Sequence, residues 1–423
     1  MRTLPYNFMI FQLIGLWRPV HWPPGLKTNL YNSYTLFVVL FVSAITLFEF
    51  LDLIGSMDDL ESFAQNSFIL LTMIGVCGKT ANFLKKRRKL IELTNVLKNY
   101  PCLPHNLEEL AIQRNINRLT RFNILSYGAL TGVAVGAVVI SSILQDISRR
   151  TLLFNIWLPY DHSSSIGFWI AYLHQILAHV AGASINVAYD TIVPGLMLET
   201  CGQLKILKNR IKKVPEAINV IHDHETEGSD RTYGIGETKV LAECVKHHLV
   251  IFKFAKELNN AFNLMIFVQY TISIVVLCVS VFEVSKMELF SPQFTSIIIY
   301  LICMSVQIFQ FCFYGNEVTF ESISIRDGIY EMDWTALSVK TKKSLIVFMI
   351  CAGMPIQFTS FSVVTMNLDS FNNTNLLLGI NASHYSSSNF LTPLTTFSND
   401  HLNEILKITI RFVYTGIYYT IKA

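Results

Sequence analysis

The stretch Phe63–Leu84, FAQNSFILLTMIGVCGKTANFL, runs directly into Lys85-Lys86-Arg87-Arg88-Lys89 and decides the fold class. An apolar helix of about 20 residues crosses the roughly 30 Å hydrocarbon core of a bilayer. Consecutive lysines and arginines directly after such a helix are typical of its cytoplasmic end. The stretch therefore predicts a helix that crosses a membrane and ends in the cytosol.

The rest of the chain has the same character. Of its 423 residues, 52% are hydrophobic and 15% are charged, and the mean hydropathy is +0.42. Soluble domains carry about 25% charged residues. The apolar runs are apolar on all sides, which excludes surface helices of a soluble protein. We predict an all-α membrane protein with seven transmembrane helices, at Tyr34–Ile54, Phe63–Leu84, Phe122–Leu144, Gly167–Tyr189, Asn260–Glu283, Phe294–Val318 and Ser344–Asn367.

The distribution of basic residues predicts the orientation. The segment Lys85–Arg121 carries nine lysines and arginines and Cys201–Lys256 carries ten, whereas Gly55–Ser62 carries none. Because basic loops stay in the cytoplasm, we expect a cytoplasmic N-terminus and an extracellular C-terminus. The apolar segment Leu4–Trp17 is too short to span and is expected to lie at the membrane interface. The sequons at Asn372 and Asn381 then fall on the outer side.

The cytoplasmic segments are long, and their apolar spacing predicts that several spans continue as helices beyond the bilayer. The polar stretch Lys213–Lys239 is predicted to be a flexible loop. It contains His222-Asp223-His224-Glu225, but a mobile run lacks the fixed geometry that a metal site needs. No catalytic motif is present in the sequence. We expect no enzymatic activity, no cofactor, no metal and no nucleic-acid partner.

Three sets of residues resemble the insect odorant receptor family over most of the chain up to Phe371. They are Gly15-Leu16-Trp17 near the start, Glu243-Cys244-Val245-Lys246-His247-His248 before the fifth span, and Tyr314-Gly315-Asn316-Glu317-Val318 followed by Ser322, Tyr330, Trp334, Lys343-Ser344-Leu345 and Pro355. The resemblance implies a subunit of a ligand-gated, non-selective cation channel, assembled as a hetero-tetramer with the odorant receptor coreceptor. It also implies the plasma membrane of olfactory sensory neurons as the location.

The resemblance further implies an odorant pocket among spans two, three, four and six. The candidate ligand-binding residues are Thr72, Met73, Val76, Gly132, Gly136, Tyr172, Gln175, His179, Tyr300, Met304 and Gln307. None is Asp, Glu, Lys or Arg, which favours a small neutral hydrophobic ligand. The ridge Gly128, Gly132 and Gly136 is most commonly a sign of close helix packing, and its missing side chains could also leave room for a ligand. Asp190 lies deep in span four and needs a partner that the sequence does not identify.

The candidate subunit anchor residues are Tyr314, Glu317, Ser322, Tyr330 and Trp334. We divide the chain into a cytoplasmic N-terminus with an interfacial helix (1–33), spans one to six with the ligand-pocket bundle (34–318), a cytoplasmic anchor segment (319–343), span seven with the start of the pore helix (344–371), an atypical polar insert (372–402) and a tail that resembles the end of a pore helix (403–423).

The tail holds the candidate pore and gate residues Thr409, Phe412 and Thr415. Arg411 in this tail would repel cations. The insert is either a true variation or the product of a mis-joined terminal exon.

Three alternatives remain at this point. A G-protein-coupled chemoreceptor would have the opposite orientation and usually extracellular cysteine pairs. A gustatory-type receptor shares the topology but ends in a different signature. A transporter or membrane enzyme is disfavoured because no internal repeat and no intramembrane charged cluster is evident.

Overall fold

The computed structural model describes residues 4–55, 60–154, 156–160, 164–224, 230–286, 291–335, 337–361 and 364–373. The candidate pore residues Thr409, Phe412 and Thr415, the sequon at Asn381 and the tail 403–423 lie outside this part of the chain. So does the insert from residue 374 onward. The predictions made for them are therefore carried forward as predictions.

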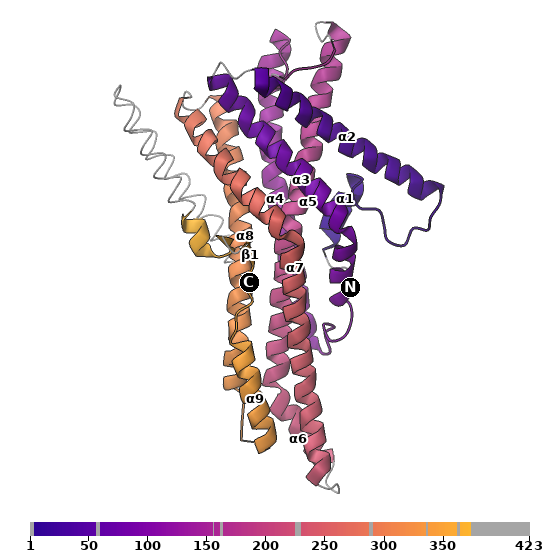
Figure 1. The fold of residues 1–423 in the computed structure, drawn as a ribbon, viewed down its shortest axis with the longest axis vertical. Helices are drawn as coiled ribbons and strands as arrows, with labels where there is room; N and C mark the ends of the chain where they lie inside the picture. The colour runs from indigo at the N-terminus through magenta and orange to yellow at the C-terminus, as the bar shows by residue number, and fades with distance from the viewer. Residues whose placement is uncertain are drawn as a thin grey trace, which may run out of the picture.

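The described chain forms an elongated bundle of long helices with one small hairpin (Figure 1). Its elements are α1 (Pro5–Leu13), α2 (Leu26–Gly55), α3 (Leu60–Val96), α4 (Leu107–Arg149), α5 (Ser165–Lys212), α6 (Val214–His224), α7 (Asp230–Lys286), α8 (Pro292–Tyr330), α9 (Val339–Ala352), β1 (Thr359–Ser360) and β2 (Val364–Thr365).

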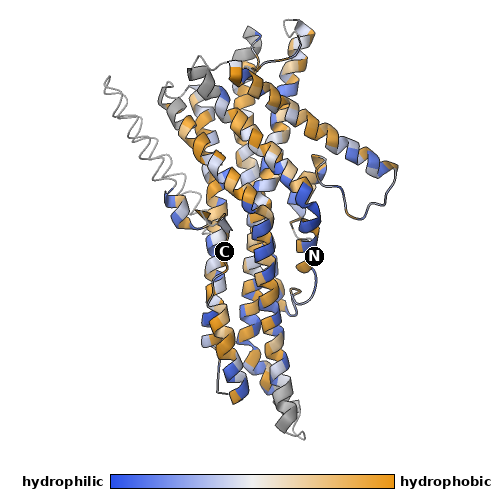
Figure 2. Cartoon of the chain, in the orientation of Figure 1, coloured by the Kyte–Doolittle hydropathy of each residue, from blue (hydrophilic) through white to orange (hydrophobic). Residues whose placement is uncertain are grey.

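The longest helices are far longer than a bilayer is thick. Helices α5 and α7 have 48 and 57 residues, which correspond to about 70 and 85 Å at 1.5 Å per residue. Apolar residues dominate one end of the bundle and polar residues are mixed in at the other (Figure 2). The prediction that spans continue as helices well beyond the length of a bilayer crossing is confirmed. Within α3 the helix continues through the basic run Lys85–Lys89 to Val96.

Among the described residues, five helices are long and apolar enough to cross a membrane. They are Leu26–Gly55, Leu107–Leu144, Ser165–Lys212, Gly236–Ser280 and Phe294–Tyr330. These contain the predicted spans one, three, four and six and span five as far as Ser280, and the second apolar run lies in α3. Several long apolar helices are thus present, and the count of seven crossings stays a prediction.

Serine side chains set the starts of three helices. The hydroxyl of Ser164 accepts a hydrogen bond from the backbone N–H of Gly167, and Ser291 and Ser338 do the same at the starts of α8 and α9. These caps satisfy N–H groups that have no partner within the helix. Each of these three helices therefore begins directly after a serine.

The prediction of one continuous seventh helix over Ser344–Asn367 is wrong. Helix α9 has only 14 residues and ends at Ala352, and the short antiparallel hairpin β1–β2 follows. Gly353 is the C-terminal cap, and Pro355 both lacks an N–H and disfavours helical geometry at the residue before it. The apolar run therefore splits into a short helix and an extended segment.

The extended segment after α9 packs across α8 at Gly315. A Cβ added at Gly315 would lie 2.5 Å from the backbone oxygen of Met366, so a side chain has no room there. One turn on, the Thr319 hydroxyl donates to the Ile356 carbonyl at 3.1 Å, and Ser322 Oγ accepts from the Ile356 N–H at 3.0 Å. The Tyr-Gly motif of α8 is thus explained by backbone-to-helix packing.

The prediction of a flexible loop at Lys213–Lys239 is also wrong, because most of this stretch is helical. Helix α6 spans Val214–His224, and α7 begins at Asp230. Val214 and Ile218, four residues apart on one helical face, are both buried in the core. That apolar spacing was present in the sequence and outweighs the polarity of the surrounding residues.

Arg210, in the last turn of α5, holds the loop between α3 and α4. Its guanidinium donates to both carboxylate oxygens of Glu109, at 3.0 and 2.8 Å, and to the backbone carbonyls of Pro101 and Leu103, each at 2.7 Å. The planar fork of an arginine suits such a set of acceptors better than an ammonium group does. This cluster fixes the end of the bundle opposite the apolar half.

His247 on α7 continues this cluster. Its Nε2 lies 2.9 Å from Gln203 Oε1, and Gln203 in turn donates to the carbonyl of Cys102. Its Nδ1 lies 3.2 Å from the Arg210 guanidinium, which can only donate, so the ring accepts there and is neutral. Burial, followed by the neighbouring Arg210 charge, lowers the pKa of His247 to about 3.

Candidate functional site: an apolar cavity between four helices

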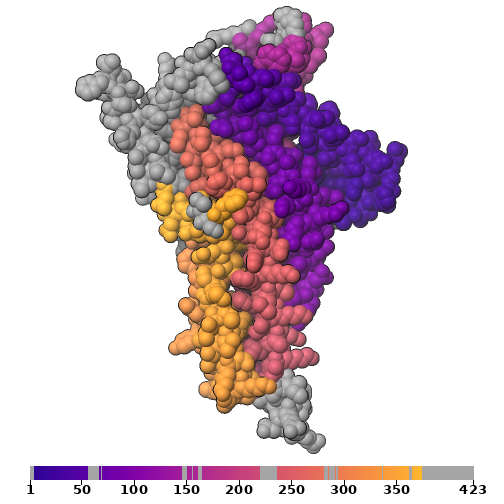
Figure 3. Space-filling model, in the orientation of Figure 1, coloured from indigo at the N-terminus to yellow at the C-terminus, as the bar shows by residue number. Residues whose placement is uncertain are grey.

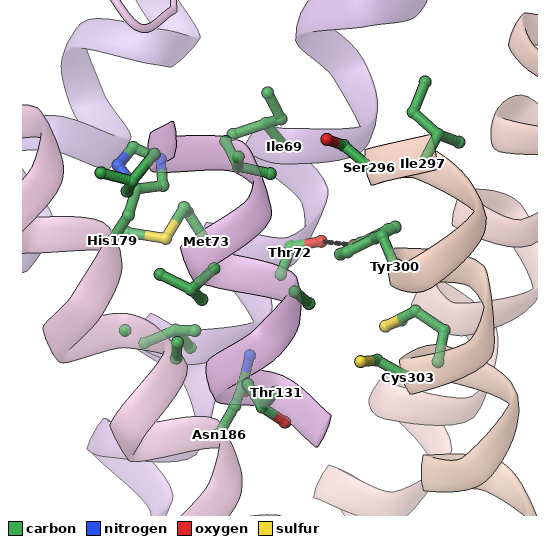
Figure 4. Close-up of a pocket in the computed structure, with 18 of the residues that line it drawn as sticks. Ile69, Thr72, Met73, Thr131, His179, Asn186, Ser296, Ile297, Tyr300 and Cys303 are labelled. Carbon is green, nitrogen blue, oxygen red and sulfur yellow. Dashed lines mark hydrogen bonds between the residues drawn. The ribbon is translucent and has the colours of Figure 1, made fainter. Parts of the chain in front are cut away.

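A cavity of about 190 Å³ lies in the apolar half of the bundle, between α3, α4, α5 and α8 (Figure 4). Seven of the candidate ligand-binding residues line it: Thr72, Met73, Val76, His179, Tyr300, Met304 and Gln307. The four helices that were expected to enclose a pocket therefore do enclose one. Whether these residues contact a ligand stays a prediction.

Four candidates do not line the cavity. A Cβ added at Gly132 or Gly136 would meet nothing within 4 Å, so this edge of α4 faces open space. A Cβ at Gly128 would contact Val187 at 3.5 Å, so only that glycine brings two helices together. The other face of α4 lines the cavity, with Thr131 among its residues.

Tyr172 and Gln175 are structural residues above the cavity. The Tyr172 hydroxyl lies 3.1 Å from Ser142 Oγ on α4. The Gln175 side chain accepts from the Phe154 N–H at 3.2 Å and donates to the Phe154 carbonyl at 3.0 Å. The hydrogen bonds of Tyr172 hold α4 against α5, and those of Gln175 hold the loop that contains Phe154 against α5. Phe154, placed in this way, lines the cavity in their stead.

Sequence reasoning missed most of the α4 wall and the inner end of the cavity. Further lining residues include Ile69, Tyr127, Thr131, Val135, Val138, Ile176, Ala183, Asn186, Ser296, Ile297 and Cys303. Thr131, Val135 and Val138 follow one face of α4 at helical spacing. That spacing is present in the sequence, but the glycines four residues apart lie on a different face of α4 from the one that lines the cavity.

A pair of hydroxyl groups crosses the cavity wall. Thr72 Oγ1 on α3 lies 2.6 Å from Tyr300 Oη on α8, and the two side chains face each other in Figure 4. Most of the remaining wall is apolar. Such a site gains affinity from buried apolar area, about 25 cal/mol per Å², while a few polar groups orient the ligand.

The inner end of the cavity is polar because a buried ion pair lies behind it. Lys79 Nζ is 2.7 Å from Asp190 Oδ1, and the two side chains are 1% and 0% exposed. Lys79 also donates to Asn186 Oδ1 at 2.8 Å, and Gln307 donates to Asp190 Oδ2. Asn186 and Gln307 line the cavity, so the pair is one residue removed from it.

This pair corrects the expectation that no intramembrane charged cluster exists. Lys79 lies within the second predicted span and Asp190 lies one residue after the fourth. A charge buried at this depth persists when a partner and hydrogen bonds compensate its desolvation. Lys79 and Asp190 are 111 positions apart in the sequence, which is why the sequence did not identify a partner for Asp190.

A second polar pair lies at the other end of the cavity. His179 Nδ1 donates to the backbone carbonyl of Gln175 at 2.7 Å, which leaves Nε2 directed at Glu49 Oε1 at 3.0 Å. Glu49 on α2 is 4% exposed. Since Nδ1 already carries a hydrogen, one further proton must lie between Nε2 and the carboxylate for the contact to be attractive. The Phe154 ring packs 4.8 Å from the imidazole.

The candidate anchor residues have different environments. Tyr314 and Ser322 are buried within the bundle, Glu317 is half-buried, and the Trp334 indole donates to the carbonyls of Ile329 and Tyr330. Only Tyr330, 75% exposed, presents its ring to the outside.

Helix α9 offers a larger outward surface. Val347 and Ile350 on the helix are 61 and 68% exposed, and Met354, two residues after the end of the helix, is 65% exposed. Figure 3 shows the orange α9 region on the surface of the molecule, at the tip of the bundle that lies away from the apolar half. Exposed apolar side chains that are grouped in this way are typical of a contact with another protein or with a membrane.

Comparison with known proteins decides the family. The family model described as 7tm Odorant receptor matches residues 59–376, about three quarters of the chain. The chain belongs to the insect odorant receptor family. It is therefore a multi-pass membrane receptor and not an enzyme, as expected from the sequence. The alternatives of a membrane enzyme and of a transporter are thereby set aside.

Individual relatives agree with this assignment. The chain is 25% identical to odorant receptor Or1 of Anopheles gambiae, over 86% of this chain and 90% of that protein. It is 24% identical to odorant receptor 46a, isoform A, of Drosophila melanogaster, over 80% and 83%.

A solved structure supports the fold. The olfactory receptor OR5 of Machilis hrabei superposes with a TM-score of 0.75 at 15% identity, over 88% of this chain and 94% of that one. The same receptor in complex with eugenol matches equally well, with a TM-score of 0.75 over 89% and 96%. The likeness extends over nearly the whole bundle, so this chain has the odorant receptor fold.

Proposed function

We propose that this odorant receptor binds a small, neutral, hydrophobic odorant in the cavity between α3, α4, α5 and α8. The carrying observation is the cavity itself: an apolar wall interrupted by the Thr72–Tyr300 hydroxyl pair and the amide of Asn186. Apolar area supplies affinity and the polar groups select orientation. The Machilis relative binds eugenol, a small molecule of this kind, which supports the proposal.

We further propose that odorant binding opens a non-selective cation channel formed with the odorant receptor coreceptor. Helices α5, α7 and α8 run from the cavity wall or its surroundings to the end where α9 exposes its apolar face. Long packed helices of this kind carry a change at one end to the other. The exposed face Val347, Ile350 and Met354 supports assembly with other subunits, and the pore is assigned to the C-terminal tail with Thr409, Phe412 and Thr415.

The orientation and the location belong to the same proposal. The basic segments Lys85–Arg121 and Cys201–Lys256 support a cytoplasmic N-terminus and an extracellular C-terminus. The plasma membrane of olfactory sensory neurons is the corresponding site of action. Sequencing the transcript across Phe371–Glu404 tests the insert, since a native message without it would assign residues 372–402 to a mis-joined exon.

The test of the cavity is an odorant-evoked current in cells that express the chain together with the coreceptor. A panel of neutral odorants is applied first to the wild type with G-protein signalling blocked. Ala183→Trp fills the cavity and is expected to abolish the current at unchanged surface expression. Ala129→Trp, at an exposed position of α4, is the matched control and should respond like the wild type. Persistent responses of Ala183→Trp, or no current across the panel, would contradict the proposal.

A further inference from the structure

A second cavity, of about 300 Å³, lies between α1 and α4 and is lined by residues that differ from those of the odorant cavity. Helix α1 is held against α5 here. The Asn7 amide nitrogen donates to the Ala188 carbonyl at 3.2 Å and to Thr191 Oγ1 at 2.7 Å. The cavity is therefore bounded by a fixed helix and not by a loose terminus.

Two arginines give this cavity a positive charge. Arg118 and Arg121, three residues apart on one face of α4, both line it, and the Arg121 guanidinium lies 5.1 Å from the centre of the Tyr6 ring. Within the described part of the chain, neither guanidinium has a carboxylate partner or a hydrogen bond. Arg210 is different, because its donors are all directed at acceptors. An unpaired pair of guanidinium groups at a cavity favours an anion with several oxygens, such as a phosphate.

The walls also hold two buried polar atoms that lack a partner among the described residues. They are Asn7 Oδ1 and Thr120 Oγ1, on side chains that are 1% and 6% exposed. The Asn7 nitrogen is committed to the Ala188 carbonyl, which can only accept, so the assignment of Oδ1 as the free acceptor holds. A buried polar atom that is left unpaired is unfavourable, because it has lost its hydrogen bonds to water without gaining others. A ligand that satisfies both must carry a hydroxyl or ammonium donor beside its phosphate oxygens.

The position along the bundle points to the membrane boundary. Arg118 and Arg121 directly precede the third predicted span, which begins at Phe122, and Ala188 is in the last turn of the fourth, which ends at Tyr189. On the two helices that bound the cavity, Met9 and Leu13 of α1 and Leu125 of α4 are 51, 68 and 51% exposed. Basic cavities between helices at the cytoplasmic surface recognise anionic lipid headgroups, and adjacent apolar side chains accommodate acyl chains.

We propose that the cavity between α1 and α4 binds the headgroup of an anionic phospholipid whose phosphodiester carries a hydroxyl or ammonium donor. Arg118 and Arg121 contact the phosphate, Thr120 donates to one of its oxygens, and Asn7 Oδ1 accepts from the headgroup donor. The lipid thereby links α1 to α4. The assignment to the cytoplasmic leaflet rests on the proposed orientation of the chain, whereas binding itself does not depend on odorant recognition or on channel opening.

Native mass spectrometry of the purified full-length chain in detergent, with thermal unfolding measured in parallel, tests the proposal. The lipid probes are dioleoyl phosphatidylinositol and dioleoyl phosphatidylcholine, and the soluble probes are glycerophosphoinositol and inorganic phosphate. We expect one phosphatidylinositol to be retained per chain and to raise the unfolding temperature. Phosphatidylcholine has a phosphate but no donor and no net charge, so it should do neither.

Variants locate the binding. Arg118→Gln/Arg121→Gln should lower phosphatidylinositol occupancy at least tenfold, whereas Arg114→Gln, exposed one turn earlier on α4 and not at the cavity, should leave it unchanged. Thr120→Val keeps the side-chain shape and should reduce occupancy several-fold, which keeps the test decisive if the double variant does not fold.

Three results would overturn the proposal. The first is retention of both lipids alike, and the second is equal loss in the Arg114 variant. The third is full stabilisation by inorganic phosphate or glycerophosphoinositol, which would assign the cavity to a soluble anion.

Discussion

Lys79 on α3 and Asp190 on α5 form an ion pair of 2.7 Å that is closed off from solvent, with side chains 1% and 0% exposed. Asn186 and Gln307 connect this pair to the inner end of the cavity between α3, α4, α5 and α8. The pair therefore joins three helices of the cavity wall at the level where the apolar half of the bundle ends. A change in the distance between α3 and α5 would therefore alter both the ion pair and the inner end of the cavity.

Removal of one partner of this pair should destabilise the receptor strongly. Lys79→Met leaves Asp190 buried without a counter-charge, and a broken buried pair costs about 3–5 kcal/mol. We expect a large fall in the apparent melting temperature of the purified receptor, and partial recovery in Lys79→Met/Asp190→Leu. Lys89→Met removes an exposed contact with Glu257 and should stay near the wild type. Equal melting temperatures for the Lys79 and Lys89 variants would refute this role.

A side chain at Gly315 should displace the segment after α9. The Cβ of Gly315→Ala would lie 2.5 Å from the Met366 carbonyl oxygen, and overpacking of this kind costs about 1–3 kcal/mol. Limited proteolysis of the region 353–367 and the odorant-evoked current report the change. Gly132→Ala is the control, because its Cβ would meet nothing within 4 Å. Protection of the segment in Gly315→Ala as in the wild type would show that the packing adapts.

His247 should make the fold sensitive to mild acid. Its folded pKa of about 3 lies below the usual value near 6.5, so its contribution is complete above pH 6.5 and is lost progressively as the pH falls towards 3. At pH 5 the loss amounts to about 2 kcal/mol, because the unfolded ring binds a proton that the folded ring refuses.

His247→Gln should therefore flatten the dependence of thermal stability on pH between 7 and 5. Gln keeps a donor and an acceptor for Gln203 and Arg210 but does not titrate. His21→Gln, at an exposed position, should retain the wild-type profile. An unchanged slope in His247→Gln would assign the acid sensitivity to other groups.

The exposed face of α9 should be needed for assembly. Ile350→Glu places a charge in the middle of this apolar face. The Ile350 side chain is 68% exposed in the single chain, so the chain itself should fold normally. We expect co-purification with the coreceptor to fall several-fold at unchanged monomer stability. Leu107→Glu, at a comparably exposed position at the start of α4, should assemble normally. Undiminished co-purification of Ile350→Glu would place the subunit contact elsewhere.

Local sequence features settled the fold class and the helices. Six of the seven predicted apolar runs lie in long helices, because an unpaired backbone group in hydrocarbon costs several kcal/mol. Local features also explain the failures. Val214 and Ile218 carried a helical signal that the polar context obscured, and Gly353 with Pro355 marked the break in the seventh apolar run.

The site was predictable only in part. Seven candidate residues line the cavity because each lies on the inner face of its helix, which periodicity can indicate. The prediction that Gly132 and Gly136 line the cavity was wrong because the direction in which a row of glycines faces depends on how the neighbouring helices pack. The prediction that Tyr172 and Gln175 line the cavity was wrong because their polar groups form hydrogen bonds with Ser142 and Phe154.

What the sequence by itself determined is that several helices are long and apolar enough to cross a membrane, since this depends on the local transfer of side chains and backbone from water, and the family to which the chain belongs, since its motifs are read directly from the residues. Only the tertiary structure decided which side chains meet. Lys79 reaches Asp190, and Arg118 and Arg121 share a cavity with Asn7, across 111 or more residues of chain. Such contacts follow from the rotation and register of packed helices, which no local pattern records.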